Sequence, residues 1–111
     1  MHTQPLCFIY TTAKSLDEMK NIVSVLLDEK LIACANISPG VKTFYRWENK
    51  VASADEATAI LKTRDSLFSA VEARIRKLHS YSIPCVAKVQ VSAVSEPFHA
   101  WILSETLVSA P

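Results

Sequence analysis

The sequence predicts an α+β domain whose elements follow the order β-α-β-β-α-β, with a short helix near the C-terminal end. Apolar residues recur at the 3.6-residue spacing of an amphipathic helix in two segments, 16–27 and 67–78. Four other segments are short apolar runs or alternate apolar with polar residues, which is the pattern of strands. A length of 111 residues suits one hydrophobic core, so we expect residues 1–111 to form a single domain.

The first half begins with a strand and a capped helix. Leu6 to Tyr10 is a continuous apolar run, as expected for a central strand. Ser15 and Glu18 have the spacing of a capping box, in which each side chain binds the backbone amide of the other residue. The apolar periodicity that follows predicts a helix that ends near residue 29 or 30.

A long kinked hairpin follows this helix. Its first strand runs from about Ala33 to Trp47 and contains Pro39-Gly40, which holds the only glycine of the chain. We expect a bulge there, because proline cannot donate to a sheet ladder and glycine adopts a positive φ at little cost. With one glycine, the chain has few other positions suited to positive φ. A polar turn at 48–50, with Asn49 able to take positive φ, leads to an antiparallel strand from about Ala54 to Thr63.

The second half again places a helix before a strand. Asp65 is expected to cap a helix whose buried face holds five apolar residues, namely Leu67, Phe68, Val71, Ile75 and Leu78. A fourth strand is predicted from Cys85 to about Val91. Ser95-Glu96-Pro97 suits the start of the short last helix, since proline is tolerated in a first helical turn.

Two halves with one helix each are the arrangement of a ferredoxin-like sandwich. That fold leaves one face of its sheet uncovered, and the predicted strands lack the polar alternation of a solvated face. The hairpin strand is also too long and too apolar for an exposed edge. We therefore expect contacts between subunits, and so a homo-oligomer.

Composition and charge exclude several classes of function. The net charge is +1 and the basic residues are spread along the chain, which gives no electrostatic basis for binding nucleic acid or a membrane surface. No segment approaches the roughly 20 apolar residues of a transmembrane helix. Residues 1–5 lack the basic and apolar regions of a signal peptide, so we expect a cytoplasmic protein.

No motif of a common catalytic class is present. A single glycine excludes the P-loop, the G-x-G-x-x-G loop and the G-x-S-x-G elbow. Cys7, Cys34 and Cys85 form an odd set without C-x-x-C spacing, and we expect three buried, reduced thiols. A nucleophilic Cys85 activated by His79 would lack a third group to orient the imidazole. We therefore do not expect an enzyme.

Three groups of side chains are candidates for a binding site. His79, in a loop between the second helix and the fourth strand, suits a metal or ligand contact, or else a hydrogen-bonded joint at the helix end. Lys62 and Arg64 lie where a strand passes into a helix, and would hold an anion with the free helix amides or form a salt-bridged strand end. The hairpin supplies residues that line the same region or pack into a neighbouring subunit: Tyr45, Trp47 and Glu48.

Several blocks of sequence carry a resemblance to a known family. Residues 31–41, LIACANISPGV, are similar to the block "LAACVNIIPGV", and residues 44–50, FYRWENK, are similar to "YxWxGK". The segments 61–64, 67–68 and 79–84 are similar to "KTR", "LF" and "HPYExPE". With these blocks in the right order over nearly its whole length, the chain resembles the CutA family of divalent-cation tolerance proteins.

The resemblance implies a tight homotrimer, formed through the long hairpin strands, that acts in tolerance of copper and other divalent ions. It implies no catalytic activity and no required cofactor. A divalent cation such as copper is the ion that His79 would bind. The family also resembles PII-type signalling trimers, so the alternative is a module that holds a small anionic metabolite in clefts between subunits. A purely structural trimer that anchors another protein is a third class. The expected cleft residues are Tyr45, Trp47, Glu48, Lys62, Arg64 and Tyr81.

The chain departs from the family pattern at several motif positions. Ser80 stands where the family has a proline, and Ser82 and Cys85 stand where it has glutamates. Thr11 matches the position at which some relatives carry a cysteine that is proposed to bind copper, and Asn49 replaces the hairpin glycine. Of that proposed metal-binding set only the histidine at position 79 is present, and one imidazole does not make a copper site.

Overall fold

The computed structural model describes residues 4–111, and His2, which the sequence places in an N-terminal tail, lies outside the described residues. The elements follow the predicted order. They are β1 (Leu6–Ala13), α1 (Leu16–Asp28), β2 (Cys34–Trp47), β3 (Lys50–Arg64), a 3-10 turn η1 (Asp65–Leu67), α2 (Phe68–Leu78), β4 (Val86–Gln90) and α3 (Glu96–Glu105).

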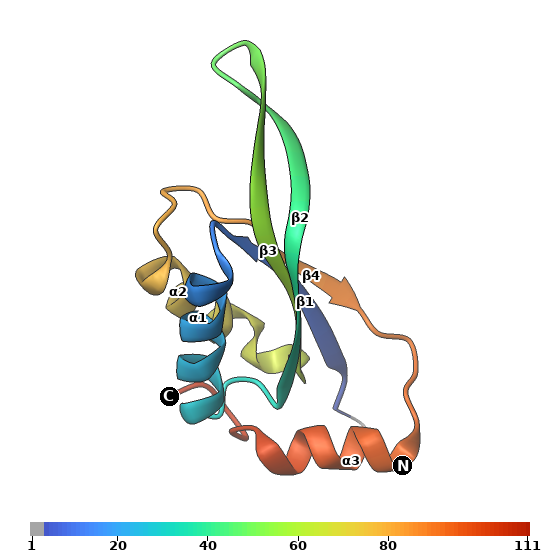
Figure 1. Cartoon of the computed structure of the whole chain (residues 1–111). Coiled ribbons are helices and arrows are strands. Elements are labelled where there is room, and N and C mark those ends of the chain that lie inside the picture. The colour runs from blue at the N-terminus through green and yellow to red at the C-terminus, as the bar shows by residue number, and fades with distance from the viewer. Residues whose placement is uncertain (1–3) are drawn as a thin grey trace.

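The four strands form one antiparallel sheet in the order β2-β3-β1-β4. Helices α1 and α2 lie together on one side of this sheet, and α3 crosses the end of the sheet that is opposite the hairpin tip (Figure 1). This is the ferredoxin-like α+β fold that the sequence predicts, with the long hairpin and the short C-terminal helix added to it. In the described part of the chain, no helix is long and apolar enough to cross a membrane.

The core lies between the sheet and the two helices. Ile9 of β1 and Leu61 of β3 face the helices and are 0% exposed. They pack with Met19 of α1 and Ile75 of α2 in one cluster of buried side chains. Because successive strand residues point to opposite faces, the residues between them point to the other side of the sheet.

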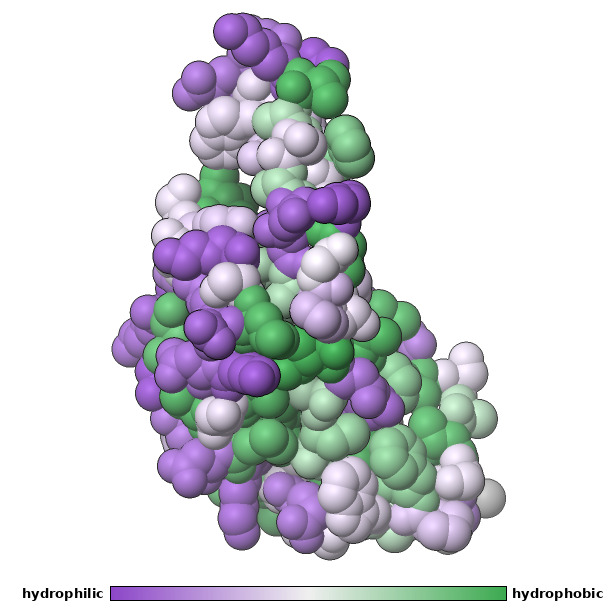
Figure 2. Space-filling model, in the orientation of Figure 1, coloured by the Kyte–Doolittle hydropathy of each residue, from purple (hydrophilic) through white to green (hydrophobic). Residues whose placement is uncertain are grey.

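That other face of the sheet is apolar and uncovered. Tyr10 and Ile60 are paired across β1 and β3, and they remain 38% and 42% exposed. Val89 of β4, on the same face, is 51% exposed. Figure 2 shows hydrophobic residues gathered over the body of the molecule below a hydrophilic hairpin tip. An uncovered apolar face of this kind is typical of a surface that meets another protein.

The hairpin projects well beyond the rest of the molecule (Figure 1). Pairing along β2 and β3 shifts register between Ser38 and Val41, and Gly40 has φ +66° there, so the predicted bulge is confirmed. The returning strand begins at Lys50 rather than near 54, because the turn is tight: Glu48 and Asn49 both have positive φ, at 49° and 64°. Glycine is therefore not the main source of positive φ in this chain.

The two predicted helix caps have different outcomes. Ser15 accepts a hydrogen bond of 3.1 Å from the backbone N–H of Glu18, as the capping box predicts. The Glu18 carboxylate, however, accepts from the backbone N–H of Ser80 at 3.2 Å. Asp65 does not cap α2, because the chain first makes the 3-10 turn and the Asp65 carboxylate lies 3.1 Å from Lys88 Nζ.

The cysteines also differ from the prediction. All three are free thiols; Cys7 is buried, Cys34 is partly buried and Cys85 is exposed. The prediction of three buried thiols is wrong at Cys85, because β4 begins only at Val86 and Cys85 ends the loop before it. Its side chain therefore belongs to a loop at the sheet end, which is where the candidate site lies.

Candidate functional site

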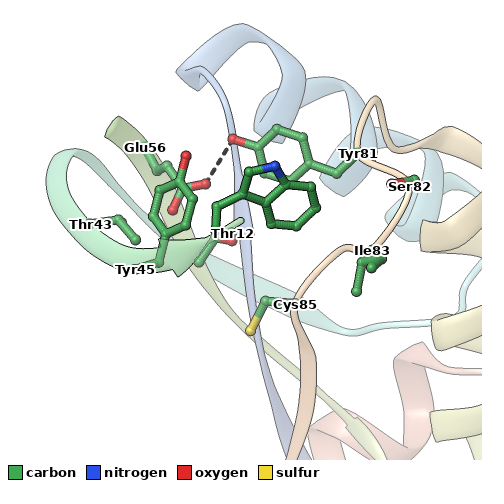
Figure 3. Close-up of a pocket in the computed structure, with 9 residues that line it drawn as sticks. Thr12, Thr43, Tyr45, Glu56, Tyr81, Ser82, Ile83 and Cys85 are labelled. Carbon is green, nitrogen blue, oxygen red and sulfur yellow. Dashed lines mark hydrogen bonds between the residues drawn. The ribbon is translucent and has the colours of Figure 1, made fainter. Parts of the chain in front are cut away.

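A pocket of about 460 Å³ lies between the part of the hairpin beyond the Gly40 bulge and the loop that joins α2 to β4. Its walls come from strands β1, β2 and β3 on one side and from residues 81–85 on the other (Figure 3). A volume of this order is that of a pocket for a small molecule. The lining residues are Thr12, Thr43, Tyr45, Trp47, Glu56, Tyr81, Ser82, Ile83 and Cys85.

Strand alternation aims the hairpin residues into this pocket. Thr43, Tyr45 and Trp47 occupy every second position of β2 and so share one face of the strand. Glu56 of β3 pairs with Val41, which places its carboxylate on that same face. The bulge at Gly40 separates this part of the hairpin from the part that covers the core.

The loop opposite the hairpin is held by hydrogen bonds to β1. Thr11 Oγ1 donates to the carbonyl of Cys85 at 2.7 Å. The Nδ1 atom of His79 accepts from the backbone N–H of Tyr81 at 3.0 Å. The proton of the neutral ring therefore sits on Nε2, which donates to the carbonyl of Thr12 at 2.7 Å. These bonds fix the direction in which the Tyr81 side chain leaves the loop.

Tyr81 and Glu56 meet across the pocket. The Tyr81 hydroxyl donates a hydrogen bond of 2.8 Å to Glu56 Oε2, drawn as a dashed line in Figure 3. Burial, and then this bond and the negative charge of Glu56, raise the pKa of Tyr81 to about 12. The phenol therefore stays neutral at physiological pH and acts as a hydrogen-bond donor to Glu56.

Cys85 lines the same pocket beside Ile83. Partial burial in the pocket wall, and then the charge of Glu56, raise the pKa of the Cys85 thiol. Since the thiolate is the reactive form of cysteine, this environment disfavours nucleophilic chemistry at Cys85.

The structure brings some of the predicted site residues together. Tyr45, Trp47 and Tyr81 line the pocket. His79 lies behind them, with its ring centroid 4.9 Å from that of Tyr81 and its side chain 0% exposed. Glu48 lies away from the pocket lining, in the two-residue turn at the hairpin tip.

Lys62 and Arg64 are not brought to this pocket, because they lie at the opposite end of β3. The Lys62 ammonium lies 5.3 Å and 5.5 Å from the ring centroids of Phe8 and Phe98. Arg64 is 6% exposed, and its guanidinium donates to Thr106 Oγ1, Gln4 Oε1 and the carbonyl of Leu103. Two of these hydrogen bonds join β3 to the end of α3 and the third joins it to Gln4 before β1, so within one chain Arg64 is a structural residue.

Sequence reasoning missed Glu56, the one charged residue among those that line the pocket. A signal was present, because an acidic residue within a predicted apolar strand, on the same face as Tyr45 when the hairpin is paired, is out of place unless it has a role. Thr12, Thr43, Ser82, Ile83 and Cys85 were missed as pocket residues as well. They become neighbours only through the sheet order, which local sequence does not reveal.

The described residues do not form a ready metal site. No group of three or more His, Cys, Asp or Glu side chains lies close enough to hold a metal ion in residues 4–111. At His79 both ring nitrogens are hydrogen-bonded, so binding a metal there requires one of these bonds to break. One chain by itself therefore does not fit a tightly held copper ion.

Comparison with known proteins identifies the family. The sequence model of the family described as "CutA1 divalent ion tolerance protein" matches residues 7–105. The chain belongs to this CutA1 family. It is 38% identical over 101 residues to a "Divalent-cation tolerance protein CutA" of Pyrococcus horikoshii. The aligned residues cover 91% of this chain and 98% of that protein. A CutA of Archaeoglobus fulgidus is 41% identical over 95 residues, covering 86% and 92% of the two chains.

Solved structures of CutA1 proteins have the same fold. The crystal structure of CutA1 from Oryza sativa has a TM-score of 0.94 at 32% identity, covering 96% of this chain and 98% of that one. CutA1 from Ehrlichia chaffeensis has a TM-score of 0.91 at 28% identity, covering 96% and 100% of the two chains. The names of relatives state different cellular locations. A structure from Archaeoglobus fulgidus is called periplasmic, and the protein of Arabidopsis thaliana is called chloroplastic.

Proposed function

We propose that this chain acts in tolerance of divalent cations such as copper, as a homotrimer that binds the ion weakly. The match of the CutA1 family model to residues 7–105 carries the proposal for the biological role. Weak binding is proposed because the described residues of one chain lack a preformed group of metal ligands. The ion's ligands would then be His79, water and side chains of a second subunit.

The proposal of a homotrimer is supported by the uncovered face of the sheet. Tyr10, Ile60 and Val89 present apolar area that a lone subunit leaves in water. The hairpin adds Phe44, which is 75% exposed, and Val51, which is 70% exposed. Burial of this surface between copies of the chain would stabilise an assembly by about 25 cal/mol for each Å² removed from water.

We further propose a cytoplasmic binding protein without catalytic activity. The three cysteines are free thiols, which suits a reducing compartment. The raised pKa of Cys85 leaves it protonated near neutral pH, and the His79 ring is buried behind Tyr81, so these residues do not form an activated nucleophile. The alternative, a PII-like module for an anionic metabolite, gains no support from the pocket, because among residues 4–111 Glu56 is the only charged residue that lines it.

The test of this proposal is a calorimetric titration of the purified protein with copper(II), run beside His79→Ala and His79→Gln. The expected result is weak, saturable binding that both variants lose. His99→Ala removes a different imidazole, on α3, and is the matched control. Light scattering on the same samples measures the mass in solution, with three chains expected. A monomeric protein, or copper binding that both His79 variants retain, would contradict the proposal.

A further inference from the structure

Three aromatic side chains and one carboxylate converge on the pocket between the hairpin and the 81–85 loop. Tyr45 and Trp47 come from β2, Tyr81 comes from the loop, and Glu56 comes from β3. Tyr45 and Trp47 line the pocket and are 43% and 56% exposed, so neither side chain is fully packed within one chain. The faces of Trp and Tyr rings carry negative electrostatic potential and attract cations.

Glu56 gives the pocket a net negative charge. The residue is 7% exposed, and within the described part of the chain its carboxylate has no ion pair. In the same residues, its one hydrogen-bond partner is the Tyr81 hydroxyl, which carries no positive charge to offset a carboxylate. A charge that is removed from water without a partner of opposite sign is costly, so a cation in the pocket would relieve that cost.

The pKa shifts of two other side chains of the pocket are consistent with a negative charge on Glu56. Burial is the largest cause of the raised pKa of both Tyr81 and Cys85, and Glu56 adds to it, at Tyr81 by a hydrogen bond and its charge and at Cys85 by its charge. In both cases the neutral form is favoured over an anion. No Lys, Arg or His is among the lining residues, so nothing in the described pocket wall offsets the carboxylate.

The shape and chemistry favour an organic cation over a bare metal ion or an anion. A divalent metal ion requires several oxygen, nitrogen or sulfur ligands in a defined geometry, and the pocket supplies one carboxylate and a few neutral groups. An anion would meet Glu56 with no positive partner. An alkylated ammonium group needs no fixed ligand geometry, because it interacts with aromatic faces through its whole surface.

We infer that this pocket binds a small organic ammonium ion, with its cationic head between the aromatic rings and beside Glu56. The apolar lining would contact the alkyl groups, and Thr12, Thr43 and Ser82 at the wall supply hydroxyls for a polar tail. This inference concerns a different ligand from the copper proposal and does not depend on it. A second subunit would add to the walls of the pocket, so the assembled protein is the form to test.

The experiment compares choline with 3,3-dimethylbutan-1-ol, a neutral molecule of nearly the same shape. Binding is measured by isothermal titration calorimetry, which needs no tryptophan reporter and therefore serves every pocket variant, including one that lacks Trp47. Sodium chloride at matched ionic strength corrects for screening. Choline is expected to bind saturably, and the neutral analogue at least about tenfold more weakly, because it lacks the cation–π and carboxylate interactions.

Variants locate the site. Glu56→Gln and Trp47→Leu are each expected to weaken choline binding by about tenfold, whereas Asp55→Asn is expected to leave it unchanged. Asp55 is the matched control because it is the neighbouring carboxylate of β3, points to the opposite face and is paired with Lys42 at 2.8 Å. Trp47 is 56% exposed, so its replacement should not disturb folding. The Trp47→Leu variant therefore still tests the site if Glu56→Gln proves to be misfolded. Equal binding of choline and its neutral analogue, an absence of saturable binding, or retention of affinity in both pocket variants would overturn the inference.

Discussion

Tyr81 and Glu56, which are 25 residues apart in the sequence, are joined by a hydrogen bond of 2.8 Å from the phenol to the carboxylate. The bond connects the loop before β4 to the hairpin and closes one side of the pocket. After burial, which is the largest cause, this bond and the negative charge of Glu56 raise the pKa of the phenol further, because a neighbouring carboxylate disfavours a second negative charge.

The phenol of Tyr81 is predicted to ionise near pH 12, above the ordinary value of 10.0. Because the folded-state pKa is raised, the neutral phenol contributes stability that is fully present below about pH 10 and is lost as the pH rises through about 12. Phenolate absorbance in a pH titration measures the step. It should vanish in Tyr81→Phe and persist in Tyr10→Phe; an unchanged titration curve in Tyr81→Phe would refute this assignment.

Cys85 is predicted to react slowly with iodoacetamide despite its exposure. Partial burial and the charge of Glu56 raise the pKa of its thiol, so less thiolate is present near neutral pH than for a cysteine in an unfolded peptide. Mass spectrometry of the modified peptide, measured across a pH series, gives the rate profile. Glu56→Gln should shift the rate profile of Cys85 to lower pH, but only part of the way to that of the unfolded peptide. Burial, the larger cause of the raised pKa, remains in this variant. A profile that matches the unfolded peptide would contradict this prediction.

Arg64 is predicted to stabilise the attachment of α3. Arg64→Met removes hydrogen bonds to Thr106 Oγ1, Gln4 Oε1 and the carbonyl of Leu103, and the acceptor that loses its donor at Thr106 is buried. The expected loss is about 3 kcal/mol in the free energy of unfolding, measured with urea. Arg76→Ala is the control, since Arg76 forms an exposed pair with Glu72 at 3.4 Å and should cost under about 0.5 kcal/mol. A similar loss of unfolding free energy in the two variants would contradict the prediction that the hydrogen bonds of Arg64 contribute more than an exposed ion pair.

Gly40 is predicted to be required for its backbone conformation rather than for space. Its φ is +66°, and a Cβ atom added there would meet nothing within 4 Å. Gly40→Ala should therefore destabilise the protein by about 1 kcal/mol through backbone strain alone. Gly40→Asn should cost less, because asparagine tolerates this conformation. Thermal unfolding measures the stabilities of the two variants and of the unchanged protein. An alanine variant as stable as the unchanged protein would show that the positive φ at position 40 does not require glycine.

Much of the fold could be predicted because the relevant signals are local. The spacing of apolar residues after Ser15 predicts α1, and the pair Pro39-Gly40 predicts the bulge in β2, since each depends on residues that are close in sequence. Errors occurred where a local pattern has two outcomes. Asp65 is a good helix cap by type, but its carboxylate pairs with Lys88 of β4, a partner that no local rule identifies.

The site was predicted less completely than the fold. The order of elements, the kinked hairpin, the loop that holds His79 and the family resemblance can all be read from residues close together in the sequence. The contact between Glu56 and Tyr81, the place of Cys85 in a pocket wall and the burial of Arg64 under α3 cannot. Secondary structure follows from spacings of a few residues along the chain, whereas burial and charge environment depend on which distant strands become neighbours in the sheet.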